Sequence, residues 1–181
     1  DAGEQTKVTE SIQDFLDKNF AIENDFEFIF GTLEWIRHNI TGFDWETDGI
    51  QNFRKRTSEE ILKSKKSCGC SDHAILFRGF MVARKLPSYY VEYLEKDFLV
   101  NELNNMYSGH VLVRVKIKDH WYLVDPTTGA MTIGSIRSLI RGKEYVKYKE
   151  GFDSWDIGIN DWDSYAKASL KFRDEWTNEN T

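Results

Sequence analysis

The sequence contains few cysteines and prolines and no long apolar run. Its 181 residues include two cysteines and two prolines. Cys68 and Cys70 are separated only by Gly69, so they cannot link distant segments, and a disulfide that closed so small a ring would be strained. The sequence is therefore not that of a disulfide scaffold, and two free thiols raise the question of reactivity.

No apolar stretch approaches the roughly 20 residues of a membrane-spanning helix, so we expect no membrane insertion. The sequence begins at Asp1 with neither a Met nor a signal peptide. We interpret it as a processed product, an excised domain or an engineered fragment. A secreted or cell-surface protein whose export signal was removed fits this start, but composition defines neither the compartment nor the oligomeric state.

The chain has no excess of positive charge. Thirty acidic and 24 basic residues give a formal net charge of -6, which disfavours a nucleic-acid-binding protein. We interpret the local basic runs at 54–56 and 63–66 as solvated faces. Hydrophobic residues make up 40% and aromatic residues 14% of the chain, which is enough for one packed core. We therefore expect a single domain spanning residues 1–181.

Apolar periodicity predicts helices first and strands afterwards. Helical spacing, a capping box at Thr57–Glu60 and the stop at Pro87 predict helices at residues 8–20, 26–40, 57–66, 70–86 and 162–176. Period-two patterns predict strands at 89–94, 110–117 and 121–124, the last two as a hairpin. Residues 1–7 look like a flexible polar lead-in. This order is typical of an α+β fold with an antiparallel sheet.

Cys70 is predicted to open a helix. Helix N-termini present unpaired backbone N–H groups and a partial positive charge, which favour a thiolate. The same N–H groups can stabilise an oxyanion during acyl transfer. A free cysteine taken alone is more often a small core residue, so the interpretation of Cys70 as a nucleophile depends on its partners.

His110 and Asp125 are the candidate partners. His110 begins one strand of the predicted hairpin and Asp125 ends the other. Pairing around a turn at 118–120 places His110 opposite about position 128, close to Asp125. An imidazole held there by a carboxylate can move the thiol proton. Alone, His110 could be a hydrogen-bonded edge residue and Asp125 a turn residue before a proline.

Three motifs in this order resemble the core of the transglutaminase-like superfamily over roughly residues 26–128. They are Cys70-Ser71-Asp72-His73-Ala74, Gly109-His110-Val111-Leu112-Val113-Arg114-Val115 and Trp121-Tyr122-Leu123-Val124-Asp125-Pro126-Thr127. The resemblance implies a papain-like fold with N-terminal helices, the nucleophile at a helix N-terminus, and an antiparallel sheet. It implies Cys70 as nucleophile, His110 as general base and acid, and Asp125 as the orienting group.

The implied activity is cysteine acyl transfer on amide bonds through a thioester, without a cofactor and with a protein or peptide as substrate. Hydrolysis of the peptidase or amidase type is the first choice, and transglutaminase-type cross-linking is the alternative. Residues 96–108 are a candidate rim of the substrate groove. One departure from the family is Cys68, which stands where Gly is common. Side-chain donors to the oxyanion are common in the family upstream of the nucleophile, and Gln51, Asn52 and Trp45 are candidates.

Two further interpretations compete with the triad. Cys68, Cys70, His73 and His110 could hold zinc tetrahedrally, although a Cys-x-Cys pattern followed by His is loose and leaves the Asp125 motif unexplained. Alternatively, the chain could keep the fold as a non-catalytic interaction module, because fold alone does not prove function.

Overall fold

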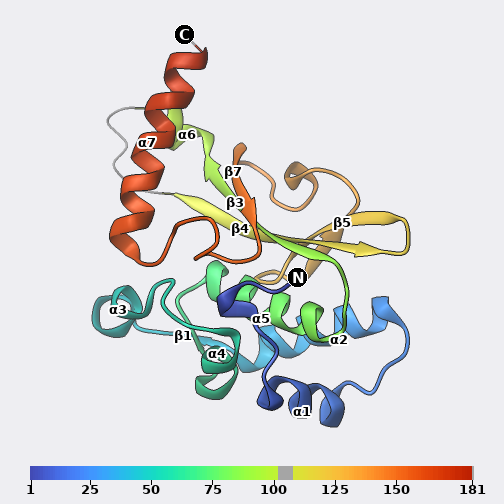
Figure 1. Cartoon of the computed structure of the whole chain (residues 1–181). Helices are drawn as coiled ribbons and strands as arrows, with labels where there is room; N and C mark the ends of the chain where they lie inside the picture. Colours follow the sequence, from blue (N-terminus) through green and yellow to red (C-terminus); the bar gives the residue numbers. More distant parts are fainter. Residues whose placement is uncertain (102–107, 181) are drawn as a thin grey trace.

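A layer of helices packs against one face of a central antiparallel sheet in the computed structural model of the chain, which describes residues 1–101 and 108–180. Figure 1 places α1–α5 below the sheet and the C-terminal helix at one end of it. The α+β class predicted from the sequence is confirmed. Residues 102–107, within the candidate groove rim, lie outside the described residues.

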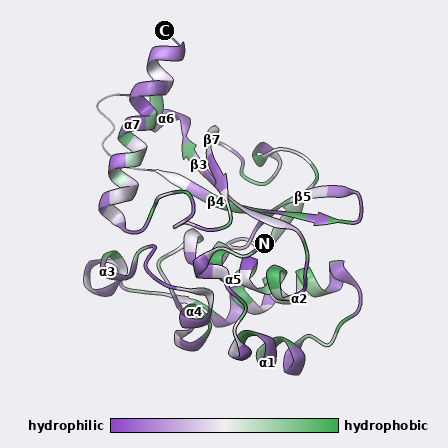
Figure 2. Cartoon of the chain, viewed as in Figure 1, coloured by the Kyte–Doolittle hydropathy of each residue, from purple (hydrophilic) through white to green (hydrophobic). Residues whose placement is uncertain are grey.

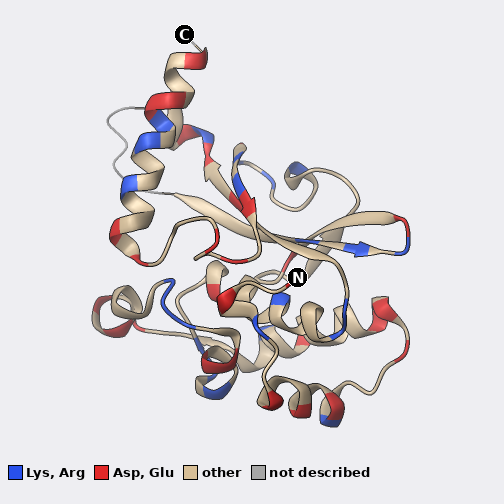
Figure 3. Ribbon diagram, in the orientation of Figure 1, with Lys and Arg blue, Asp and Glu red and all other residues tan. Residues whose placement is uncertain are grey.

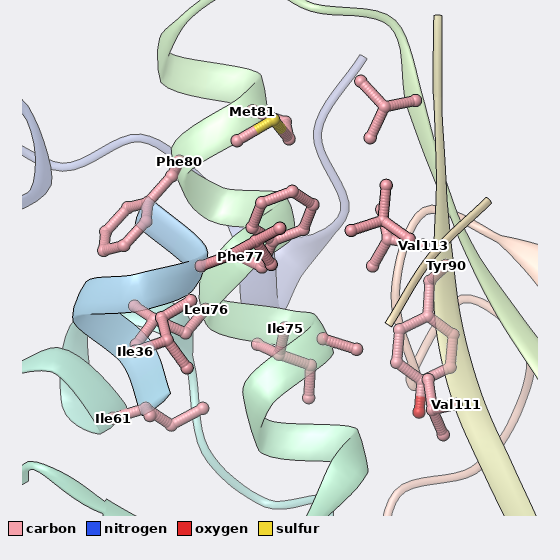
Figure 4. Packing of buried hydrophobic residues seen from close by; sticks show 14 of the residues in the cluster. Ile36, Ile61, Ile75, Leu76, Phe77, Phe80, Met81, Tyr90, Val111 and Val113 are labelled. Atoms are coloured by element: carbon pink, nitrogen blue, oxygen red, sulfur yellow. The ribbon is translucent and has the colours of Figure 1, made fainter. Parts of the chain in front are cut away.

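Helix α5, Cys70–Ala83, is the centre of the core. Ten of its 14 residues are buried. Around it lie α1 (Glu10–Asn19), α2 (Asp25–Asn39) and α4 (Ser58–Ser64). Figure 4 shows Phe77 of α5 beside Val113 and Tyr90 of the sheet, and Figure 2 shows α5 as predominantly hydrophobic. Burial of each such side chain contributes about 1.5–3 kcal/mol to the stability of the folded chain. This packing holds the first turn of α5 in a fixed place.

Five strands form the sheet in the order β6-β5-β4-β3-β7, with every neighbouring pair antiparallel. Their bounds are β3 Ser88–Glu95, β4 Gly109–Ile117, β5 His120–Asp125, β6 Ala130–Thr132 and β7 Tyr145–Gly151. Along β4, Val111, Val113 and Val115 face the main core, whereas Leu112 packs with Leu123 and Ile136 in a second cluster. The sheet thus has an inner face toward α5 and an outer face covered by the β6–β7 connection.

The remaining elements are short, apart from the C-terminal helix. They are η1 (Glu4–Thr6), β1 (Thr41–Gly42), the π-helical turn η2 (Trp45–Gly49), α3 (Ile50–Asn52), β2 (Lys66–Ser67), α6 (Lys96–Val100), η3 (Ile136–Ser138) and α7 (Trp162–Asn180). Strands β1 and β2 pair in parallel just before α5 and fix the loop that leads to Cys70. None of the described helices combines the length and apolar character needed to cross a membrane.

The β4–β5 register differs from the predicted one by a single residue. The turn contains only Lys118 and Asp119, because Ile117 pairs with His120. Extended along the strands, this register places His110 opposite position 127 rather than 128. Strands β6 and β7 were not predicted. Strand β7 pairs with β3 across a bulge at Glu92 and Tyr93, where the pairing register of the two strands shifts.

The first residues differ from the expected flexible lead-in. Gln5 and Thr6 are fully buried. The Gln5 side chain donates to the carbonyl oxygens of Arg54 and Arg56, and its backbone N–H donates to Asp153 at 2.8 Å. These polar residues are buried because their hydrogen-bonding groups find partners more than 45 residues away along the chain.

The interpretation of the basic run at 54–56 as a solvated face is wrong. Arg54 and Arg56 are 2% and 8% exposed. Arg54 forms a bidentate ion pair with Glu92, at 2.7 and 2.9 Å, and Arg56 pairs with the buried Asp72. Buried charges require such partners, and neither carboxylate is close in the sequence.

The capping box that starts α4 is formed as predicted, with Thr57 accepting from the Glu60 backbone N–H and Glu60 accepting from that of Thr57. Thr57→Ala is expected to lower the free energy of unfolding by about 1 kcal/mol, because it removes the cap hydroxyl. Urea denaturation measures this change. Thr57→Ser keeps the hydroxyl and should be nearly neutral; an equal loss in both variants would contradict a capping role.

Candidate functional site

Cys70 lies at the first position of α5, as predicted, and its side chain is half-buried. The preceding Gly69 has φ +106°, a conformation that strongly favours glycine, and it has no side chain to cap the helix. The N–H groups of the first turn therefore remain available to a ligand at Cys70. Serine or any larger residue at position 69 would strain this turn.

A buried ion pair fixes the loop in front of Cys70. Asp72 accepts a hydrogen bond from the Cys68 backbone N–H at 2.8 Å and pairs with Arg56. Arg56 in turn donates to the Lys66 carbonyl oxygen at 2.8 Å and to Ser64 at 2.9 Å. Asp72 thus connects the α5 start to the loop that precedes it, and the position of Cys70 depends on this connection.

His110 and Asp125 come together at the edge of the sheet. Nε2 of His110 lies 3.0 Å from Oδ2 of Asp125, which is fully buried. The other carboxylate oxygen of Asp125 accepts from the backbone N–H of Thr127 at 2.9 Å. Burial alone would raise the pKa of Asp125, but the hydrogen bonds from His110 and Thr127 lower it below its usual value. The carboxylate is therefore charged and oriented toward His110.

The side chains of His110 and Cys70 interact. Burial lowers the pKa of His110, but its hydrogen bond to Asp125 and the negative charges of Cys70 and Asp125 outweigh burial and raise the pKa to about 10. Because Nε2 is bound to Asp125, Nδ1 is the ring nitrogen left for Cys70. The structure thus brings together the three residues that the sequence motifs singled out.

Cys68 has a different environment. Its thiol donates to the Gly49 carbonyl oxygen at 3.3 Å. Burial and the nearby Asp72 raise the pKa of Cys68 to about 12. A thiol with that pKa stays protonated at neutral pH and is a poor nucleophile.

The alternative zinc ligands have other partners. His110 is bound to Asp125, the Cys68 thiol to Gly49, and Nδ1 of His73 lies 3.4 Å from Thr127. Burial lowers the pKa of His73, so its ring is neutral at pH 7. Across residues 1–101 and 108–180, no three His, Cys, Asp or Glu side chains are grouped as metal ligands would be. Among the described residues, the alternative zinc ligands are therefore not grouped as one metal site.

The three candidate oxyanion donors lie in two consecutive short helices, Trp45 at the start of η2 and Gln51 and Asn52 in α3. Trp45 is exposed and packs edge-on against Phe53 and Trp162. Asn52 donates its amide to the Asp48 carbonyl oxygen at 2.9 Å, and Gln51 is exposed. The η2 turn is close to the Cys68–Cys70 loop, because Gly49 accepts from the Cys68 thiol. The assignment of a side-chain donor among these residues stays a prediction.

The motifs did not predict the charged and aromatic residues around Cys70. Arg54 is buried beside it, enclosed by Phe53, Tyr90 and Tyr165 with ring centroids 5.0 to 5.8 Å from its guanidinium carbon. Burial disfavours its charge, but Glu92 and Tyr90 hold the pKa of Arg54 above its usual value, and Cys70 adds to this effect. Tyr165 comes from α7, so the C-terminal helix contributes to the site.

The geometry predicts an unusual titration of His110. Its ring should keep its proton from below pH 6.5 up to about pH 10, in contrast to the usual pKa of 6.5. Because the folded pKa is raised, the stabilisation by this proton is complete below pH 6.5 and is lost as the pH rises through 10. Nuclear magnetic resonance of the labelled His110 ring measures the titration. A midpoint near 6.5 for His110 would contradict the interaction with Cys70 and Asp125.

Comparison with known proteins agrees with this architecture. The model of a family described as a transglutaminase-like domain matches residues 10–150. A solved structure of a proposed cysteine protease from Cytophaga hutchinsonii is similar with a TM-score of 0.62 and 19% identity, over 88% of this chain. This chain spans 47% of that protein, about half its length.

A second solved structure, of a TGase, gives a TM-score of 0.44 and 16% identity over 67% of this chain and 34% of that one. The search of curated proteins found no match.

Proposed function

Because the chain belongs to the transglutaminase-like domain family, we propose that it is a cysteine-dependent peptidase or amidase in which Cys70, His110 and Asp125 act together. The observation that carries the proposal is the position of His110, which hydrogen-bonds Asp125 and lies close enough to Cys70 for the charge of the sulfur to raise the pKa of the ring. A base between a nucleophile and an orienting carboxylate is the arrangement that acyl transfer requires. The substrate is the amide bond of a protein or peptide.

In the acylation step, the Cys70 thiolate attacks the carbonyl carbon and forms the C–S bond. The developing oxyanion accepts from N–H groups of the first α5 turn, which Gly69 leaves uncapped. The His110 imidazolium then gives its Nδ1 proton to the leaving nitrogen, the C–N bond breaks, and an amine departs. Asp125 keeps the ring oriented by holding Nε2–H throughout.

In the second step, water attacks the thioester while neutral His110 takes a proton from it. The C–S bond breaks, the carboxylic acid leaves, and Cys70 and His110 return to thiolate and imidazolium. An amine in place of water would give a new amide by the same steps, which is the cross-linking alternative. We favour water because a proposed cysteine protease has a similar fold.

Acylation by p-nitrophenyl acetate tests the proposal without a known substrate. We expect release of p-nitrophenol and one acetyl group on Cys70, located by peptide mass mapping. His110→Ala should slow the acylation by about 100-fold or more, because it removes the imidazolium that keeps Cys70 as a thiolate. His120→Ala, which changes an exposed histidine on the same hairpin, should have no effect. Acetylation of Cys68 instead of Cys70, or equal rates in the two histidine variants, would refute the proposal.

A further inference from the structure

A cavity of about 590 Å³ lies on the outer face of the sheet, away from α5. Its walls combine apolar and aromatic side chains with two cations, and they include Tyr93, Trp121, Ile133, Tyr145, Arg114 and Lys147. Ile133 is 74% exposed, an unusual position for a large apolar side chain. In Figure 1 the connection between β6 and β7, which forms one wall, lies on the side of the sheet opposite α5.

The cavity lies next to the candidate site, through residues that neighbour His110. Tyr145 lines it, and the ring centroid of Tyr145 is 6.5 Å from that of His110. Tyr93 also lines it and is paired with His110 across β3 and β4. Arg114 also lines the cavity, and it lies four residues further along β4 on the same face of the strand as His110. At about 3.3 Å per residue the two positions are roughly 13 Å apart.

The two charged side chains in the cavity lining, Arg114 and Lys147, are both basic, although the chain as a whole is acidic. Segment 133–151 carries five basic and two acidic residues, a net charge of +3, and Figure 3 shows basic positions along it. Arg114 and Lys147 share the single carboxylate of Glu150, so one positive charge is left uncompensated. Arg114 is also held in place by the Trp121 ring, 4.6 Å away, and its buried Nε has no hydrogen-bond partner among the described residues.

We infer that this cavity binds a carboxylate on the leaving-group side of the substrate. The inference rests on the proposed function, because His110 gives its proton to the leaving nitrogen and that part of the substrate must lie over His110. From there an extended chain of about three residues and a side chain spans the roughly 13 Å to Arg114. The carboxylate belongs either to an acidic side chain or to the C-terminus of the substrate, and both offer the same chemistry to Arg114 and Lys147.

Peptides that mimic the leaving group test the inference by binding alone. We propose nuclear magnetic resonance titrations, followed at the Trp121 indole, with Gly-Ala-Glu-Ala amide, Gly-Ala-Gln-Ala free acid and the neutral Gly-Ala-Gln-Ala amide. One of the two acidic peptides should bind at least about 10-fold more tightly than the neutral one, and which one does so identifies the source of the carboxylate. Equal affinity for all three, or no binding of any, would overturn the inference.

Matched variants identify which residues cause the preference for an acidic peptide. Arg114→Gln should remove the preference, whereas Lys116→Gln, which removes the same charge two residues further along β4 and outside the cavity lining, should keep it. Lys147 is exposed, so Lys147→Gln should leave the fold intact and weaken the preference. It tests the assignment independently if Arg114→Gln disturbs folding. A preference that survives in both cavity variants would contradict the assignment. The peptide titrations need no chemistry at Cys70. If the peptides fail to bind while Cys70 is still acylated by p-nitrophenyl acetate, this inference fails and the proposed function stands.

Discussion

Cys70→Ala is expected to abolish p-nitrophenol release from p-nitrophenyl acetate above the rate of the uncatalysed reaction. The variant removes the sulfur that forms the thioester, and no other described thiol has a base beside it. The fold should persist, with a change in the free energy of unfolding within about 1 kcal/mol, because a small half-buried side chain loses one atom. Stopped-flow absorbance and urea denaturation measure the two quantities.

Cys68→Ala is the matched control for that experiment. It removes a thiol two residues away that donates to the Gly49 carbonyl oxygen, and it should retain most of the acylation rate. If Cys70→Ala releases p-nitrophenol as fast as the unchanged protein, Cys70 is not the nucleophile. If only Cys68→Ala loses activity, the two cysteines have been assigned in the wrong order.

Glu92→Leu is expected to lower the free energy of unfolding by about 3–5 kcal/mol. The substitution removes both carboxylate oxygens from Arg54, whose guanidinium is 2% exposed. The lost stability comes mainly from leaving a buried charge unpaired, since Arg54 has no access to water. Urea denaturation monitored by tryptophan fluorescence gives the value.

The double variant Arg54→Met and Glu92→Leu separates this cause from simple loss of packing. Replacement of the whole pair by apolar side chains should recover most of the stability. Glu144→Leu is the surface control, because Glu144 is exposed and its ion pairs with Lys96 and Arg137 lie in water, so it should change stability little. A double variant as unstable as Glu92→Leu would show that the unpaired Arg54 is not the cause.

The sequence predicted the helix that begins at Cys70 and the strands of His110 and Asp125, because local sequence signals define each of these elements. Pro87 ends the helical pattern, and the apolar alternation of β4 is strong. The register differs by one residue because the turn has two residues instead of three. Lys118 in this turn adopts a left-handed conformation with φ 53°. A left-handed conformation of lysine has no clear signal in a single sequence.

Burial of charged residues could not be predicted from local patterns. Arg54 looks like part of a basic surface run, but its partner Glu92 is 38 residues away and approaches only when β3 packs beside it. In the same way, Gln5 is buried because it meets Asp153 and Arg56 in the fold. Strand β7 was missed because its Lys and Glu residues weaken the apolar alternation of an edge strand.

Alkylation by iodoacetamide at pH 7, quantified separately for the two cysteines by peptide mass mapping, tests the central claim most directly. The account predicts that Cys70 reacts at least about 100-fold faster than Cys68, whose thiol is protonated because its pKa is raised to about 12. His110→Ala should remove much of this difference, because the imidazolium that stabilises the Cys70 thiolate is lost. Equal and slow alkylation of both cysteines would contradict an activated nucleophile at Cys70.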